Sequence, residues 1–186
     1  MTESTRRFDP ADYGPALAPL LAEARLAPLG PGSPNRAARP LLAALDAATA
    51  FAPHRVADPD MAAACLAGLW LYHDFLDESH TISQGLHTPE GSYWHALMHR
   101  REPDHANTAY WLRKLGRHPI LDDLAQVAAE LGYRLAGKGW DPFAFNDACE
   151  EHRGKGDEIE EMLRRVQQRE WELLFDWCYR RATGRE

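Results

Sequence analysis

The chain has 186 residues, of which 45% are hydrophobic and 26% are charged, and its formal net charge is −7 at pH 7. This length and composition indicate one globular domain with a sizeable core. The negative charge argues against nucleic acids and anionic membranes as partners, because both bind basic surfaces. Three cysteines without a Cys-x-x-Cys pair favour a reducing compartment. With no apolar leader and no membrane-length apolar run, we expect a cytoplasmic protein.

Prolines punctuate the N-terminal 35 residues, at Pro10, Pro15, Pro19, Pro28, Pro31 and Pro34. Each proline removes a backbone hydrogen-bond donor. We therefore expect residues 1–35 to form a proline-rich arm with one short helix within 16–26, lying over the domain or partly disordered. Residues 36–186 should form the single domain.

Sequence signals for the start of a helix recur along the rest of the chain. A capping side chain precedes a proline at Asp58-Pro59, Thr88-Pro89, His118-Pro119 and Asp141-Pro142, and Asp104 and Asp157 can cap without one. Apolar residues repeat at helical spacing between these points, and no segment alternates as a strand would. The pattern predicts an all-α fold, a compact array of antiparallel helices over 37–52, 59–84, 89–101, 105–115, 119–135, 142–152 and 157–182.

Histidines crowd into one part of the chain, with six of the nine between His73 and His105. At about 100° per residue, His99 lies about 40° from His95 around a helix, and Glu102 lies about 20° from His95 on the other side. All three side chains therefore share one helix face. This crowding of imidazoles and a carboxylate predicts a functional site.

A second polar stripe runs along the preceding helix. Its apolar positions, such as Leu69, lead at steps of three and four residues to His73, Asp77 and His80. A buried imidazole or carboxylate needs a partner, because burying it alone costs a few kcal/mol. We therefore expect His80 to converge with His95 and His99.

Two histidines four residues apart can hold a zinc or iron ion when a neighbouring helix supplies a third ligand. We predict one divalent transition metal on His80, His95 and His99, with Asp77 or Glu102 as fourth ligand or catalytic base. The candidate ligand-binding residues around it are Trp94, Arg100, Asp104 and Asn107. A zincin motif is excluded because no glutamate follows His95, and Pro103 weakens a di-iron motif.

Two functions are compatible with this pattern. The first is a metal-dependent hydrolase or lyase that acts on a small molecule at a histidine and carboxylate site between helices. The second is a non-catalytic helical module that binds a small anionic ligand or a protein partner. In the second case the histidines could simply hydrogen-bond to Glu102 or Asp77. The sequence identifies neither the substrate nor the oligomeric state.

The segment from Tyr93 to Asp104 reads Tyr-Trp-His-x3-His-Arg-Arg-Glu-x-Asp. Together with Gly116-Arg117-His118-Pro119, it resembles an uncharacterised family of bacterial proteins, and the resemblance extends over most of the chain after residue 70. Thr108 departs from the pattern, where alanine is expected. The resemblance implies a single domain with a site around His80, His95, His99, Glu102 and Asp104, and it implies no particular activity, cofactor or ligand.

Overall fold

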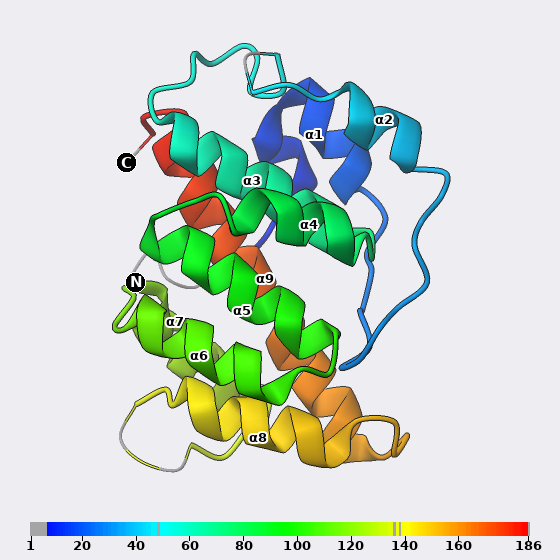
Figure 1. The fold of residues 1–186 in the computed structure, drawn as a ribbon, viewed down its shortest axis with the longest axis vertical. Coiled ribbons are helices and arrows are strands. Elements are labelled where there is room, and N and C mark those ends of the chain that lie inside the picture. Colours follow the sequence, from blue (N-terminus) through cyan, green and yellow to red (C-terminus); the bar gives the residue numbers. More distant parts are fainter. Residues whose placement is uncertain (1–6, 48, 136, 138, 186) are drawn as a thin grey trace.

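The computed structural model describes residues 7–47, 49–135, 137 and 139–185, and within these residues the chain forms helices and no strand. This confirms the all-α prediction. The elements are the 3-10 helix η2 (Pro10–Tyr13) and the α-helices α1 (Gly14–Leu21), α2 (Arg39–Ala44), α3 (Pro59–Tyr72), α4 (Leu76–Ser83), α5 (Pro89–Arg101), α6 (His105–Leu115), α7 (Ile120–Glu130), α8 (Pro142–His152) and α9 (Glu158–Ala182). In Figure 1, α5, α6 and α8 lie below one another, and α9 runs behind them.

The predicted capping residues explain where most helices begin. In five of these residues, a side-chain oxygen accepts hydrogen bonds from backbone N–H groups in the first turn of the helix. They are Asp58, Thr88, Asp104, Asp141 and Asp157. Such bonds satisfy donors that the helix itself leaves free. The helices α5, α6 and α8 span the predicted ranges as a result.

The prediction of one continuous helix over 59–84 was wrong. It is broken into α3 and α4, because His73 leaves helical geometry and Asp74 adopts a left-handed backbone with φ of 63°. Neither glycine nor proline marks this break in the sequence, so hydrophobic spacing alone suggested a continuous helix. The break turns α4 into a separate helix beside α5.

Two other predicted helices are shorter than expected. The predicted range 37–52 contains only α2, which stops where Leu45 becomes extended. The range 119–135 contains α7, which ends before Gly132, a residue with φ of 91°. A positive φ suits glycine and ends the helix there.

One large hydrophobic cluster joins the N-terminal segment to the rest of the domain. Tyr13, Leu17 and Leu20 are buried in the same cluster as residues of α3, α5 and α9. A smaller cluster around Phe145 is formed by α7, α8 and α9, and Leu29 packs into it. Residues 7–35 therefore contribute side chains to both clusters, and residues 1–6 of the predicted arm lie outside the described residues.

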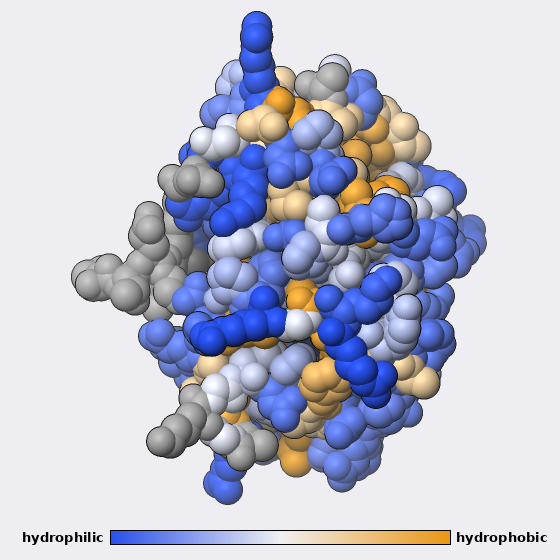
Figure 2. Space-filling view, turned by 60° about the vertical axis from the view of Figure 1, so that its left-hand side comes forward, coloured by the Kyte–Doolittle hydropathy of each residue, from blue (hydrophilic) through white to orange (hydrophobic). Residues whose placement is uncertain are grey.

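Helix α5 lies at the centre of this arrangement. Every residue from Glu90 to Arg101 is buried, and α5 contacts α3, α4 and α6. Its polar side chains must therefore find partners on neighbouring elements. The face of the molecule in Figure 2 is largely hydrophilic with small hydrophobic patches. Among the described residues, none of the helices has the length and apolarity that crossing a bilayer requires.

Candidate metal centre

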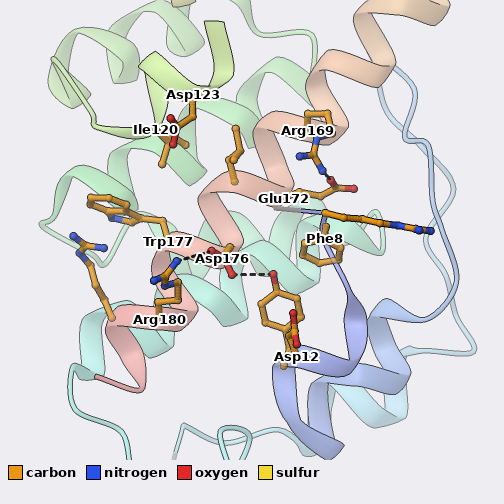
Figure 3. A pocket seen from close by; sticks show the side chains of 13 residues that line it. Phe8, Asp12, Ile120, Asp123, Arg169, Glu172, Asp176, Trp177 and Arg180 are labelled. Carbon is orange, nitrogen blue, oxygen red and sulfur yellow. Dashed lines mark hydrogen bonds and ion pairs between the residues drawn. The ribbon is translucent and has the colours of Figure 1, made fainter. Parts of the chain in front are cut away.

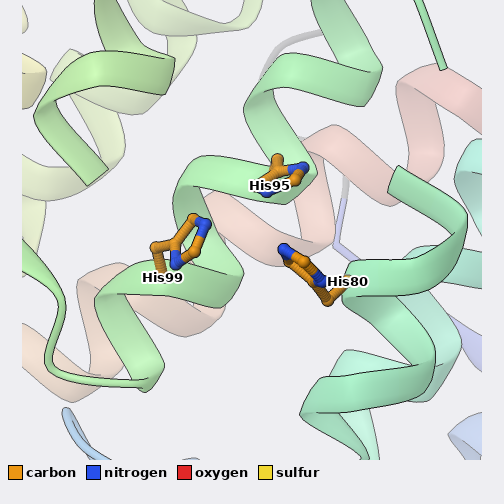
Figure 4. Close-up of side chains that lie close together, drawn as sticks. All are labelled: His80, His95 and His99. Atoms are coloured by element: carbon orange, nitrogen blue, oxygen red, sulfur yellow. The ribbon is translucent and has the colours of Figure 1, made fainter. Parts of the chain in front are cut away.

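Three histidines meet between α4 and α5. His80 comes from α4, whereas His95 and His99 lie one turn apart on α5 and face it (Figure 4). One ligand nitrogen from each ring lies within 4.8 Å of the other two. The ring centroids are 4.6 Å apart for His80 and His95, 5.4 Å for His80 and His99, and 4.8 Å for His95 and His99. The predicted convergence is confirmed.

The three rings differ in their access to solvent. His95 and His99 are buried, with 2% and 8% of their surface exposed, while His80 is half-buried. The group therefore lies at the edge of the packed core, where one side is closed by protein and His80 borders solvent.

His95 is held by the aromatic ring of Trp111 on α6. The two ring centroids are 3.9 Å apart with an interplanar angle of 22°, so the rings are stacked. The His95 Nδ1 atom is buried and has no hydrogen-bond partner among the described residues. Leaving such an atom unpaired costs about 1–3 kcal/mol, so a water molecule, an ion or another ligand at this nitrogen would be stabilising.

His99 has a carboxylate partner. Its Nδ1 lies 3.0 Å from Oε2 of Glu102 at the end of the same helix. A proton on Nδ1 is donated to this carboxylate, which leaves Nε2 as the ligand atom. A carboxylate in this position orients a ligating histidine and raises its basicity. The sequence left Glu102 as a catalytic base, a fourth ligand or a hydrogen-bond partner of the histidines, and in the structure it contacts His99.

Both buried histidines are poised to be neutral. Burial is the main cause that lowers the pKa of His95 to about 3, and the charges of His99, His80 and Lys114 act in the same direction. Burial also lowers the pKa of His99, although Glu102 opposes the shift. A neutral imidazole is the form that binds a metal ion, so neither residue needs to lose a proton near pH 7.

The three ligand nitrogens lie close enough to share one ion, although they can be farther apart than a tetrahedral ion requires. Zinc–nitrogen bonds of about 2.0–2.1 Å place tetrahedral nitrogens roughly 3.4 Å apart. The nitrogens of the group, spread over as much as 4.8 Å, would therefore close by about 1.4 Å. Three imidazoles would leave one coordination position for water or substrate.

Three other predicted site residues are occupied elsewhere or exposed. Asp77 is exposed on α4 and is not part of the histidine group, because the break before α4 ends the stripe that would have buried it. Asp104 caps α6 through the backbone N–H of Asn107, and its second oxygen accepts from the Asn107 side chain. Asp104 and Asn107 therefore stabilise the start of α6.

Trp94 and Arg100 point into the core on other faces of α5. Trp94 is fully buried against α3, where its ring fills the space beside Gly68. Arg100 is 1% exposed and forms an ion pair with Glu170 of α9, with Nη1 2.5 Å from Oε2. The structure does not bring either side chain to the histidines, because the helical turn places them on other faces.

Trp111 was not anticipated as part of the site. Only the packing of α6 against α5 places it on His95. On the same helix, the Lys114 Nζ atom lies 4.3 Å from the Trp111 ring centroid. The spacing of Trp111 and Lys114, three residues apart, is compatible with this contact but does not reveal the neighbouring histidine.

A cavity of about 390 Å³ lies elsewhere, between the N-terminal segment, α7 and α9 (Figure 3). Its wall contains Phe8, Tyr13 and Trp177 among charged side chains of both signs. Several of these pair with each other: the Tyr13 hydroxyl donates to Asp176 at 3.1 Å, and Arg169 pairs with Glu172. None of the three clustered histidines lines this cavity.

In comparisons with known proteins, no family model, curated protein or solved structure matches the chain.

Proposed function

We propose that the chain is a mononuclear metal-dependent hydrolase or lyase that acts on a small molecule. The observation that carries the proposal is the group of three histidines from two helices, whose ligand nitrogens lie within 4.8 Å of one another. Three histidines with an open fourth position are typical of catalytic zinc centres, whereas structural zinc centres have four protein ligands.

The donor set favours zinc over iron. Non-haem iron oxygenases use two histidines and one carboxylate as direct ligands. In this chain Glu102 is engaged by His99, and Asp77 is exposed outside the group. Three neutral nitrogen donors fit zinc and leave the charge of the ion undiminished.

That charge supports hydrolytic or eliminating chemistry. A zinc ion held by the three histidines would lower the pKa of a water bound at the open fourth position to about 7, and it would polarise a carbonyl or phosphoryl oxygen. Glu102 would act through His99 as a positioning residue, and His95 would be held by its stack on Trp111. The half-buried His80 borders the side from which substrate would enter.

The test is a hydrolysis assay on protein purified without a histidine tag. Zinc-loaded wild type is compared with metal-free wild type, with His99→Ala and with His87→Ala, using activated nitrophenyl esters of acetate and phosphate as probes. His87 is exposed and outside the group, so its variant is the matched control.

We expect turnover that requires zinc, survives in His87→Ala and disappears in His99→Ala. Zinc binding without turnover of any probe would contradict the hydrolase part of the proposal. Turnover that is equal in His99→Ala and wild type would contradict the site.

A further inference from the structure

The break between α3 and α4 is held by a buried carboxylate. Asp74 has a φ of 63°, an uncommon value for a residue with a side chain, and is 7% exposed. Its Oδ1 accepts from Nη2 of Arg101 at 2.5 Å, and its Oδ2 accepts from Nη2 of Arg25 at 3.0 Å. Two arginines from different elements therefore stabilise the residue at which the chain turns.

The N-terminal segment encloses this break. Arg101 also donates through Nε to the carbonyl oxygen of Gly30 at 2.8 Å. A Cβ atom on Gly32 would lie 2.3 Å from Asp74 Oδ1, so only glycine fits there. The neighbouring His73 donates through Nε2 to the Leu20 carbonyl at 2.9 Å, and the Asn35 backbone N–H donates to the His73 carbonyl at 3.0 Å.

The ion pair of Asp74 with Arg101 joins α5 to the break immediately before α4, and these are the two helices that carry the histidines. Asp74 precedes His80 by six residues, and Arg101 follows His99 by two on the adjoining helix. At 1.5 Å per residue, His80 lies about 9 Å along the chain from the break, so a 10° rotation of α4 there displaces His80 by roughly 1.6 Å. Metal–ligand distances tolerate only about 0.2 Å.

We propose that Asp74 and Arg101 are positioning residues of the metal centre, which lock α4 against α5 so that His80 completes the ligand set. This inference rests on the proposed function. The ion pair of Asp74 with Arg101 sets the metal affinity and the coordination geometry in addition to the stability of the fold.

The chain contains a matched control for a purely structural role. Arg100 precedes Arg101 on α5, is equally buried, and also pairs with a buried carboxylate, Glu170. Glu170 belongs to α9, which supplies none of the three histidines. Loss of either ion pair should cost stability, but only the Arg101 pair connects the ligand-bearing helices.

The experiment is a cobalt(II) titration of tag-free, metal-free protein, with affinity and the visible absorption of the bound ion as readouts. The variants are Arg101→Lys and Arg100→Lys, since lysine retains the charge but loses the planar fork. Asp74→Asn is the second test of the pair, because asparagine tolerates positive φ and keeps one acceptor oxygen. Circular dichroism melts identify the temperature at which every variant is folded.

We expect Arg101→Lys and Asp74→Asn to weaken cobalt binding about tenfold or more, as losses of supporting contacts around metal ligands do, and to change the visible spectrum. Arg100→Lys should lower the melting temperature and leave affinity within about twofold of wild type. Wild-type affinity in Arg101→Lys and Asp74→Asn would overturn the inference, as would equal weakening in Arg100→Lys. If wild type itself fails to bind cobalt, the proposed function fails first.

Discussion

Helix α5 carries two buried polar clusters that differ in how their groups are satisfied. Toward α9, Tyr93 and Arg100 meet Glu170, and we call these three residues the arginine cluster. Toward α4, His95 and His99 meet His80, which we call the histidine group. The two clusters occupy the same turns of one helix on different faces, yet only the first contains a complementary set of charges.

The arginine cluster is nearly complete in itself. The Tyr93 hydroxyl donates to Glu170 Oε1 at 2.8 Å, and Arg100 contacts both carboxylate oxygens. The Phe145 ring lies 4.9 Å from the guanidinium carbon. Only the Nε of Arg100 lacks a hydrogen-bond partner among the described residues. A cluster of this kind stabilises one packing arrangement of α5 and α9.

The histidine group lacks such complementarity. Three imidazoles bring no charge to neutralise one another, and Glu102 reaches only His99. The buried Nδ1 of His95 is left without a partner among the described residues. Convergence of like groups with an unsatisfied nitrogen is a poor way to stabilise a fold and a good way to bind a cation.

The largest expected effect is on the arginine cluster. Glu170→Gln removes the negative charge and leaves the guanidinium of Arg100 buried without its counter-ion. We expect the free energy of unfolding, measured by urea denaturation, to fall by about 3–5 kcal/mol. The surface pair of Glu161 with Arg165 is the control, and Glu161→Gln should cost under about 1 kcal/mol. A similarly small loss in Glu170→Gln would remove the distinction between the clusters.

Zinc should stabilise the protein through the histidine group. At a free concentration of about 100 times Kd, binding adds roughly 2.7 kcal/mol to stability. For a domain of this size the melting temperature should rise by about 5–10 °C, as scanning calorimetry would record. His99→Ala should abolish the rise and His87→Ala should retain it. A melting temperature that ignores both zinc and chelator would show that the histidine group is a hydrogen-bonded pocket.

Glu102→Gln sharpens the comparison within the histidine group. The variant keeps the size of the side chain but replaces the carboxylate that contacts His99. We expect zinc affinity to fall about 10- to 100-fold with little change in metal-free stability. Glu78→Gln on α4 is the control, because Glu78 pairs with Arg39 instead. Equal affinities in the two variants would exclude a supporting role for Glu102.

The smallest expected effect is on the pH dependence of the metal-free protein. Burial lowers the pKa of His95 to about 3, below the unfolded value of about 6.5, so the unfolded state takes up a proton first. The stabilising effect of a neutral His95 is present above pH 6.5 and is lost as pH falls. For this one group we expect a loss of about 1 kcal/mol between pH 6.5 and 5.5. His95→Gln should flatten the profile; an unchanged slope would contradict this assignment.

The sequence was sufficient to predict where the helices with a capping side chain begin. Asp141 and Thr88 illustrate this, because the cap and the following proline are local signals that tertiary packing leaves intact. The convergence of His80 with His95 and His99 was also predictable, since polar residues on apolar stripes need partners.

The features that the sequence did not predict depend on contacts between segments that are distant in the sequence. Asp74 breaks the helix because Arg25 and Arg101 stabilise it there, and neither is near it in sequence. Arg100 has the chemistry of a ligand-binding residue, but it pairs with Glu170, which lies 70 positions away in the sequence. Hydrophobic periodicity reports which face of a helix is buried but not which partner lies opposite.

Calorimetric titration of zinc into the metal-free chain, purified without a histidine tag, tests the central claim most directly. The account predicts one ion per chain for wild type and for His87→Ala, and no stoichiometric binding when His80, His95 and His99 are all replaced by alanine. Absence of binding in folded wild type, or binding that survives the triple replacement, would contradict the assignment of the histidine group as a metal centre.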